Sequence, residues 1–192
     1  LLVGLGDDFY ARGDFTNQPL NYGIYRRGAP YLDPLSGELL GVRAQSVGRA
    51  QVKTVNRDIA TLGALYAEGE IRAKDRLLGY EDSLLPSIFY PRAPDREIDA
   101  VVISVEGGLR NAGALDVVAV NRGDRDGLRA GDTLAIYKTG EIVKDQVTKQ
   151  QVRLPDERIG LLMVFRTYQK MSYGLVLVAD RQLDLGDLAR NP

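Results

Sequence analysis

The sequence contains no cysteine, no histidine and no tryptophan among its 192 residues. Without cysteine the chain has no disulfide and no thiolate nucleophile. Without cysteine and histidine together, the usual zinc and copper ligand sets cannot be built. The lack of histidine also excludes a Ser-His-Asp triad and a histidine general base. We therefore expect no metal, no cofactor and no catalytic residue of these kinds, whereas the cellular compartment stays open.

The chain also lacks an excess of either charge and any long apolar run. With 25 basic and 26 acidic residues the formal net charge is −1, so no basic footprint for nucleic acid is present. No run approaches the roughly 18 apolar residues of a membrane helix. We expect neither nucleic acid binding nor membrane insertion. Because the chain opens with Leu1 and not Met, we also expect a signal peptide or another domain to precede it in the full protein.

What the sequence does contain is an internal repeat. The stretch from Ile24 to Leu78 recurs without a gap as Ile136 to Arg190, at an offset of 136 − 24 = 112. IYRRG matches IYKTG, VGRAQV matches IGLLMV, and AKDRL falls on LGDLA. Most apolar positions stay apolar, so the repeat predicts two copies of one folded module.

The local sequence favours β-strands throughout. Short β-branched or aromatic runs bounded by turn residues are typical of barrels and sandwiches, and they occur at 100–105, 115–120, 132–137, 160–167 and 172–179. The last run is apolar on both faces, which suits a strand buried on both sides. The segment ATLGALYAEGEIR has helix-forming residues, but Gly63, Gly69 and its strand-like repeat partner favour a strand.

The predicted fold class is therefore mainly β, with two related small β-barrel-like modules. We place the first module at residues 1–80, a packed linker at 81–97 and the second module at 98–192. Three prolines exclude regular structure from much of the linker. Its apolar side chains are too many for a free tether, so we expect it to pack on a module or to meet a partner. The candidate partner-binding residues are Leu85, Ile88, Phe89 and Tyr90.

Acid–base chemistry rests on close carboxylate pairs alone, namely Asp7 with Asp8, Asp124 with Asp126, and Asp156 with Glu157. A glycosidase holds two carboxyls roughly 5 to 10 Å apart across a sugar cleft, and neighbours in a turn do not show that. The segment 121–132 has some features of a calcium loop. Arg122, however, stands where an oxygen ligand is required, so two tight turns are the better interpretation.

Several blocks carry a family resemblance: GDDFYARGDF, YLDPLSGELLG, VVAVNRGDRDGLRAGDTLAIY, LPDERIGLLMVFRTYQKMSYGLVL and GDLARNP. Together they resemble the C-terminal region of the secretin-associated LysM proteins of type IV pili, the TsaP family. Each half is also similar to the C-terminal module of the flagellar FlgT family, a small β-barrel. The resemblance covers essentially the whole chain.

The resemblance implies a signal peptide and a peptidoglycan-binding LysM domain before this region, and association of this region with the outer-membrane pilus secretin. It supplies no catalytic residue. The expected function is that of a non-catalytic periplasmic scaffold, present in many copies around the secretin ring and tied to the wall through LysM. The alternatives are a carboxylate-dependent enzyme acting on peptidoglycan and a flagellar basal-body accessory protein.

Overall fold

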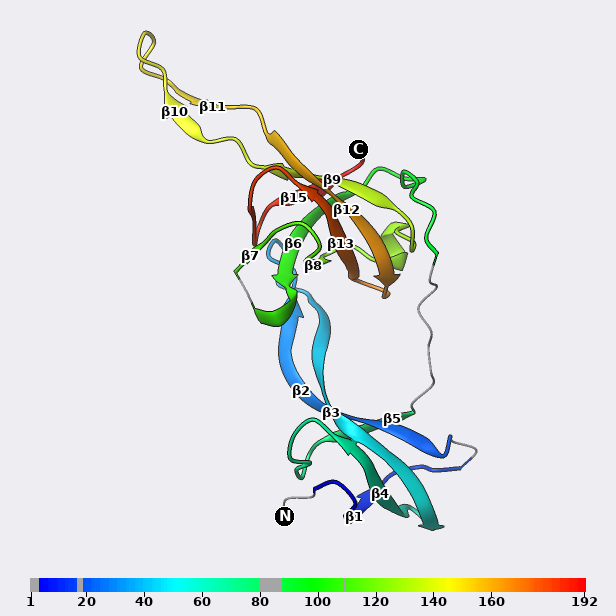
Figure 1. Ribbon diagram of the computed structural model, residues 1–192. Coiled ribbons are helices and arrows are strands. Elements are labelled where there is room, and N and C mark those ends of the chain that lie inside the picture. The colour runs from blue at the N-terminus through cyan, green and yellow to red at the C-terminus, as the bar shows by residue number, and fades with distance from the viewer. Residues whose placement is uncertain (1–3, 17–18, 80–87, 109) are drawn as a thin grey trace. The chain divides into compact units, whose positions relative to one another are not determined.

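The chain folds into two compact units in a computed structural model, which describes residues 4–16, 19–79, 88–108 and 110–192 (Figure 1). The first unit comprises Leu1–Pro30 and Val42–Leu85, and the second comprises Tyr31–Gly41 and Pro86–Pro192. Within the described ranges, no helix is long and apolar enough to cross a membrane.

The first unit is built on a five-stranded sheet in the order β1-β4-β3-β2-β5. Side chains alternate between the two faces of a strand, and the inward set here forms a core around Ile24, Val47 and Leu62. The strands are β1 (Asp8–Arg12), β2 (Asn21–Leu32), β3 (Leu39–Asn56), β4 (Ile59–Ala67) and β5 (Arg76–Gly79). The strand predicted over ATLGALYAEGEIR is confirmed as β4 only as far as Ala67, and the residues EGEIR lie beyond its end.

The second unit contains a closed barrel of six strands in the order β12-β13-β8-β6-β15-β9, which closes where β12 pairs with β9. Its strands are β6 (Asp99–Val105), β8 (Val117–Val120), β9 (Thr133–Lys138), β12 (Glu157–Thr167), β13 (Ser172–Ala179) and β15 (Leu188–Arg190). Leu134, Leu162 and Val120 are fully buried in its core. From Ser172 to Leu177 on β13, buried residues alternate with half-buried ones, and Val178 is exposed. The expected burial on both faces therefore holds only for the inner face.

Two small sheets and two short 3₁₀ helices complete the second unit. The sheets pair β7 (Asn111–Ala112) with β14 (Leu183–Asp184), and β10 (Ile142–Lys144) with β11 (Gln151–Arg153). The helices are η1 (Glu106–Gly108) and η2 (Asp124–Asp126).

The sequence repeat recurs as a repeat of strands. Adding 112 to the bounds of β4, 59–67, gives 171–179, which contains β13. The same shift moves β5 from 76–79 to 188–191, where β15 lies. It moves β2 onto β9 and β10, and β3 onto β11 and β12. The order β4-β3-β2-β5 thus becomes β13-β12-β9-β15, and the predicted duplication is confirmed.

One pair of glycines shows how closely the two copies share their packing. Gly48 on β3 and Gly160 on β12 are counterparts in the repeat, and both lie against a neighbouring backbone carbonyl. A Cβ on Gly48 would collide with the oxygen of Tyr66, and one on Gly160 with the oxygen of Val178. Tyr66 and Val178 are again counterparts, so both copies need glycine for the same close approach of strands.

The two units differ in one strand. β1 pairs with β4 as β8 pairs with β13, which makes β1 the counterpart of β8. The barrel strand β6 lies between β15 and β8, and the described part of the first unit offers no strand in the corresponding place between β5 and β1. The expectation of β modules is therefore confirmed: the second unit contains a closed barrel, and the described residues of the first form a five-stranded sheet.

The unit boundaries also differ from the predicted module ranges. Residues 31–41, predicted to lie in the first module, belong to the second unit. They form the end of the β2–β3 hairpin, which packs on the outside of the barrel. Residues 86–97 of the predicted linker likewise belong to the second unit.

Candidate interaction surfaces

The end of the β2–β3 hairpin is docked on the outer face of the barrel within the second unit. We call Tyr31–Gly41 the docked hairpin. Its Tyr31 and Leu40 form a small apolar core with Ala119 and Met171. The hydroxyls of Tyr31 and Tyr173 lie 3.0 Å apart. Because Ala119 lies on β8, and Met171 and Tyr173 lie at or beside the start of β13, the contact uses the outward side chains of two adjacent barrel strands.

An ionic clamp flanks this apolar contact. Both Glu38 oxygens accept hydrogen bonds from the Arg125 guanidinium, at 2.9 and 2.7 Å, and Lys170 Nζ lies 2.7 Å from the same carboxylate. The Arg125 contact, followed by Lys170, lowers the pKa of Glu38 to about 2. Such a bidentate pair fixes orientation, although its partly exposed position leaves it open to screening by salt.

Asp33 both shapes the docked hairpin and touches the barrel. Its Oδ1 accepts the backbone N–H of Leu35 at 2.8 Å, and its Oδ2 accepts Asn121 Nδ2 at 3.3 Å. Arg122 Nη1 lies 3.8 Å from the same Oδ2. The Leu35 N–H is the main cause of a lowered pKa at Asp33, to which Asn121 and Arg122 add. The carboxylate is buried, so these partners supply the hydrogen bonds that burial demands.

The hairpin of β10 and β11 repeats this turn without the docking. Asp145 Oδ1 accepts the N–H of Val147 at 2.7 Å, as Asp33 Oδ1 accepts that of Leu35 at 2.8 Å. A backbone hydrogen bond also recurs at the same offset: Asp33 N–H donates to the Glu38 oxygen, and Asp145 N–H donates to the Gln150 oxygen. Backbone conformation recurs as well, since Gly37 and Lys149 both have a positive φ, of 73° and 58°. The two turns are therefore the same structure.

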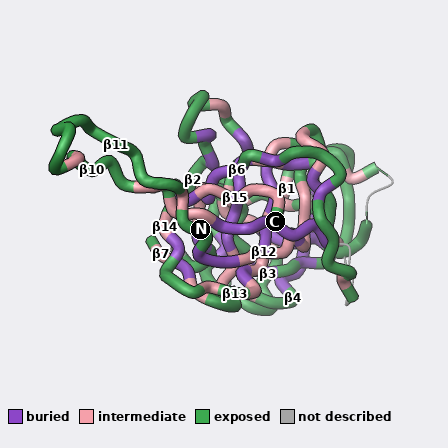
Figure 2. Tube along the Cα trace, turned by 90° about the horizontal axis from the view of Figure 1, so that it is seen from above, coloured by how far each residue is buried: buried purple, intermediate pink, exposed green. Residues whose placement is uncertain are grey.

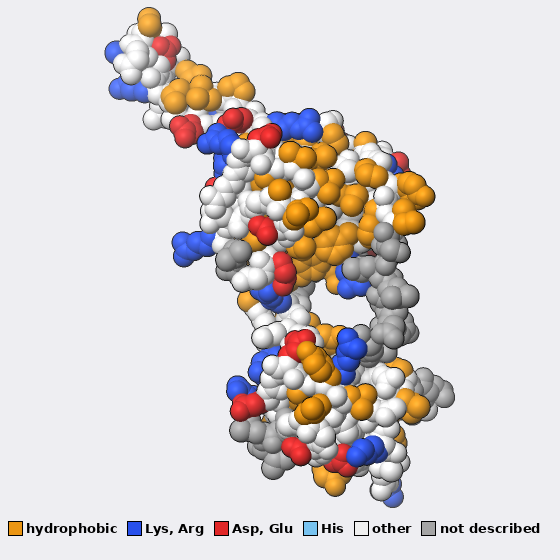
Figure 3. All heavy atoms as spheres, viewed as in Figure 1, with side chains coloured by type: hydrophobic (Ala, Val, Ile, Leu, Met, Phe, Trp, Pro, Cys, Tyr) orange, Lys and Arg blue, Asp and Glu red, His pale blue; other side chains and the backbone are white. Residues whose placement is uncertain are grey.

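We call residues 142–153 the exposed hairpin. It extends away from the barrel, and nearly all of its surface is exposed (Figures 1 and 2). Hydrophobic side chains lie along it in Figure 3. Ile142 is 66% exposed and Val147 is 88% exposed, and Val143 and Val152 are exposed to a lesser extent. Apolar side chains on a projecting hairpin mark a surface suited to an interaction.

The predicted partner-binding residues lie beside the barrel. Ile88 and Tyr90 are 68% and 81% exposed, and Phe89 is half-buried. Leu85 falls outside the described residues. The segment thus presents two apolar side chains to solvent, but their role in binding stays a prediction.

The chain after Tyr90 is fixed to the second unit. Arg92 donates its N–H to the Gly131 oxygen at 3.0 Å and accepts the Thr133 N–H at 2.8 Å. Its side chain lies 2.8 Å from the buried carboxylate of Asp132. Pro94 is buried as well. The segment from 91 onward is therefore packed structure and not a free tether.

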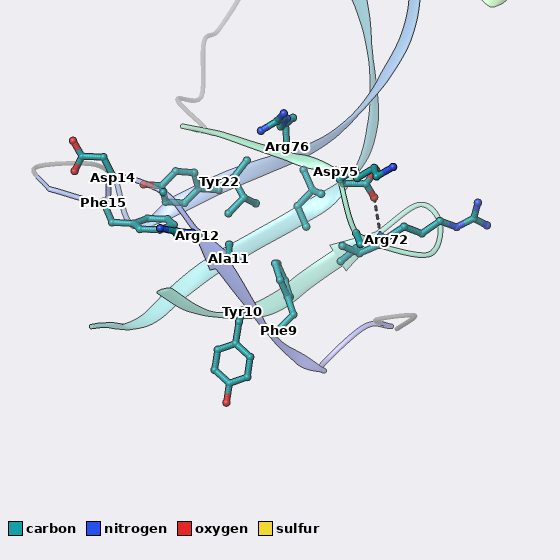
Figure 4. Close-up of a pocket in the computed structure, with 16 residues that line it drawn as sticks. Phe9, Tyr10, Ala11, Arg12, Asp14, Phe15, Tyr22, Arg72, Asp75 and Arg76 are labelled. Carbon is teal, nitrogen blue, oxygen red and sulfur yellow. Dashed lines mark hydrogen bonds between the residues drawn. The ribbon is translucent and has the colours of Figure 1, made fainter. Parts of the chain in front are cut away.

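A pocket of about 450 Å³ lies in the first unit along β1 and the turn into β5 (Figure 4). Phe15 and Tyr22 meet edge to face in it, with ring centroids 5.7 Å apart. The carboxylate of Asp75 is held by Arg26 at 2.8 Å and by the N–H of Arg72 at 2.8 Å, and Arg26 is the main cause of its lowered pKa. The pocket lies along β1 and β5, whose counterparts β8 and β15 flank β6 in the barrel. We therefore interpret the pocket as the place that β6 fills in the second unit.

The ion pair at this pocket is itself a repeated structural element. In the second unit, Lys138 Nζ lies 3.3 Å from Asp187, which accepts the N–H of Asp184 at 2.8 Å. Each of these residues is the repeat counterpart of one in the first unit. Asp75 therefore has the same architectural role as Asp187, bracing the turn before the last strand of its copy.

The carboxylate pairs considered for acid–base work have separate structural partners. Asp156 accepts the Gly140 N–H at 3.1 Å and a bond from Arg190 at 2.8 Å, which together lower its pKa. Glu157 pairs with Arg181 at 2.5 Å. Asp7 accepts the N–H of Gly4, and Asp8 pairs with Lys53. These four carboxylates thus brace turns and strands.

The segment resembling a calcium loop forms turns, as predicted. Asp126 Oδ2 accepts the Gly123 N–H at 2.9 Å and closes the short helix η2. Gly127 and Gly131 have positive φ values of 98° and 97°, which only glycine adopts freely. Across the described ranges, no group of three or more Asp, Glu, His or Cys residues could hold a metal ion.

Comparison with known proteins adds no assignment. A scan against family models and a search of curated proteins gave no match.

Proposed function

We propose that this chain is a non-catalytic periplasmic scaffold that docks on the outer-membrane secretin of type IV pili. A LysM domain in the rest of the protein would bind peptidoglycan and so tie the secretin to the wall. Several copies around one ring would each make a modest contact, with avidity supplied by the shared assembly.

The observation that carries the proposal is the exposed apolar segment Ile88–Tyr90, which directly precedes a stretch paired with the barrel. Arg92 joins the barrel two residues later by backbone pairing, so the conformational freedom lost on binding is reduced. Exposed aromatic and aliphatic side chains on a fixed segment are typical anchors of protein interfaces. The sequence resemblance to the secretin-associated family supplies the identity of the partner.

The test is retention of purified secretin by the immobilised chain. We expect retention by the unaltered chain and a strong loss with Ile88→Asp or Tyr90→Asp. Leu115→Asp is the matched control, because Leu115 is an equally exposed apolar residue (75%) elsewhere on the second unit. No secretin retained by the unaltered chain, or equal loss in the control, would contradict the proposal.

Two further experiments with the same immobilised or purified chain separate the other two interpretations. Retention of flagellar basal-body components in place of secretin would favour the flagellar role. Release of soluble fragments from purified peptidoglycan, abolished by Asp156→Asn or Glu157→Gln, would favour an enzyme.

A further inference from the structure

The docked hairpin and the exposed hairpin are copies of one element, and only one of them has an acceptor within the described part of the chain. The docked hairpin uses the outward face of β8 and β13. The counterparts of these strands in the first unit are β1 and β4. If the repeat extends to the interaction, β1 and β4 form the acceptor for the exposed hairpin.

Strand register identifies the matching acceptor positions. Tyr173 on β13 pairs with Ala119 on β8, and Thr61, the repeat counterpart of Tyr173, pairs with Tyr10 on β1. Tyr10 therefore holds the position of Ala119. It is 79% exposed and points away from the pocket in Figure 4.

Two further positions complete the acceptor face. Ile59 is the repeat counterpart of Met171, and Arg12 pairs with it at the end of β1. Ile59 is 47% exposed, and Arg12 is also exposed and reaches Asp58 at 2.7 Å. Met171, by contrast, is buried under the docked hairpin. The face that is covered on the barrel is thus uncovered on the first sheet.

We propose that the exposed hairpin of one copy docks on the outward face of β1 and β4 of a second copy of this chain. In this arrangement Val152 takes the place of Leu40 and packs against Ile59, as Leu40 packs against Met171. Val143 takes the place of Tyr31 and lies against Tyr10 and Thr61.

The charges on the two surfaces suit this arrangement. Asp145 is the counterpart of Asp33, whose carboxylate lies beside Asn121 and Arg122 on the barrel. In the first unit, Arg12 follows Ala11 as Asn121 follows Val120. Asp145 of one copy therefore meets Arg12 of the next, an attractive pair in place of an amide contact.

The ionic clamp of the docked hairpin has no counterpart in this contact. Gln150 stands where Glu38 binds Arg125, and Asp58 stands where Lys170 does. The contact between copies is accordingly weaker than the one within the chain. A weak contact is what a reversible array requires, because many copies held on one ring gain avidity from it.

The symmetry of the contact follows from its two unlike faces. A hairpin on one copy and a sheet face on the next form a head-to-tail interface, which continues from copy to copy into a closed ring or an open chain. This inference does not depend on the identity of the pilus partner, although it would suit a ring-shaped one.

The test uses the absence of native cysteine. Two single-cysteine proteins, Val152→Cys and Ile59→Cys, are mixed and treated with a short bis-maleimide. Because each protein has one thiol, a mixed dimer joins different molecules. The control replaces Ile59→Cys by Leu78→Cys, at a residue of similar exposure (53%) on β5 of the same unit.

We expect the mixed dimer of Val152→Cys with Ile59→Cys to exceed the Leu78→Cys control several-fold. Adding Asp145→Arg to the hairpin protein should reduce it, and Arg12→Asp on the acceptor protein should restore it. A yield equal to the control would overturn the proposal, as would a reduction that Arg12→Asp does not reverse. Secretin retention, measured separately on the unaltered chain, distinguishes failure here from failure of the proposed function.

Discussion

The first and second units share five equivalent strands and differ in one. In the second unit β6 lies between β15 and β8, where it adds Ala100, Val102 and Val105 to the buried core. Among the described residues of the first unit, β1 and β5 are the outer strands of the sheet, with a pocket beside them. Closure of the sheet thus depends on a strand outside the recognisable repeat. We expect the open sheet to be the part that unfolds first.

The two hairpins extend the same comparison to the surface. Their turns share hydrogen bonds and backbone conformation, but one is docked and the other is exposed. Turn geometry is therefore independent of docking. The side chains beside the turn differ, with Tyr31, Glu38 and Leu40 in the docked hairpin and Val143, Gln150 and Val152 in the exposed one.

The largest effect is expected from exchanging core residues between the copies. Leu162 is fully buried in the barrel, and its counterpart in the first unit is Ala50, also fully buried. Leu162→Ala should lower the free energy of unfolding by about 2–5 kcal/mol through the cavity it leaves. Ala50→Leu should cost about 1–3 kcal/mol through overpacking. Urea denaturation measures both, and Val178→Ala on the exposed side of β13 is the control. A change below about 1 kcal/mol for Leu162→Ala would show that the barrel core relaxes.

The next effect concerns the repeated ion pair. Asp75→Asn should lower the free energy of unfolding by about 1.5–3 kcal/mol, because a buried charge-assisted bond to Arg26 is lost. The pKa of Asp75 is lowered in the folded state, chiefly by Arg26. Its contribution is therefore complete above the ordinary pKa of about 4 and is lost as the pH falls through the lowered value.

Acid titration of stability checks this prediction. The variant should lose less stability than the unaltered chain between neutral pH and acid. Asp187→Asn gives the matched measurement in the barrel. Parallel acid curves for the Asp75 variant and the unaltered chain would contradict the assignment.

A smaller effect is expected from the tyrosine pair under the docked hairpin. Tyr173→Phe removes the 3.0 Å contact with the Tyr31 hydroxyl and should cost about 1 kcal/mol. Burial is the main cause of a raised pKa at Tyr173. Its contribution is therefore present below the ordinary pKa of about 10 and lost as the pH rises through the raised value. Ultraviolet titration should show a late-ionising tyrosine that the variant lacks, besides Tyr22, whose pKa burial also raises. Tyr66→Phe, at an exposed site, should leave that signal unchanged.

The smallest effect should come from the clamp, because its groups are partly exposed and screened by salt. Glu38→Gln gives the docked hairpin the residue that the exposed hairpin has at Gln150. We expect faster amide hydrogen exchange at residues 33–40, with little change in the barrel. The folded pKa of Glu38 is about 2, so in the unaltered chain the same loosening should appear as the pH falls from about 4.5 towards 2. Exchange that is unaltered by Glu38→Gln would show that Tyr31 and Leu40 alone hold the hairpin.

The sequence predicted the strands better than the tertiary contacts between them. The β-branched runs at 100–105 and 172–179 are strands. The ion pair and the close-packed glycine of the first copy also have counterparts in the second copy at the repeat offset. The docking of residues 31–41 was not predicted, since Asp33 and Asn121 are 88 positions apart and no local pattern encodes their contact. A sequence signal was nevertheless present: apolar residues on both sides of a turn, in both copies.

The candidate binding segment was likewise predictable only in part. The apolar character of Ile88 and Tyr90 could be seen in the sequence, and their exposure agrees with an accessible surface. That Arg92 fixes the following chain to the barrel could not be predicted, because the bond depends on Gly131 and Thr133 some forty positions later. The place of β6 was also hidden from the repeat, since β6 (Asp99–Val105) precedes the second copy, which begins at Ile136.

The docked hairpin also sets an order of events during synthesis. Tyr31 leaves the ribosome well before Tyr173, its partner 142 positions later. At roughly 5–20 residues per second, the gap is roughly 7 to 28 s. For that interval the nascent chain carries the apolar end of its hairpin unpaired, although β2 and β3 are already complete. A chaperone or a neighbouring nascent chain has this window in which to bind residues 31–41 before the barrel does.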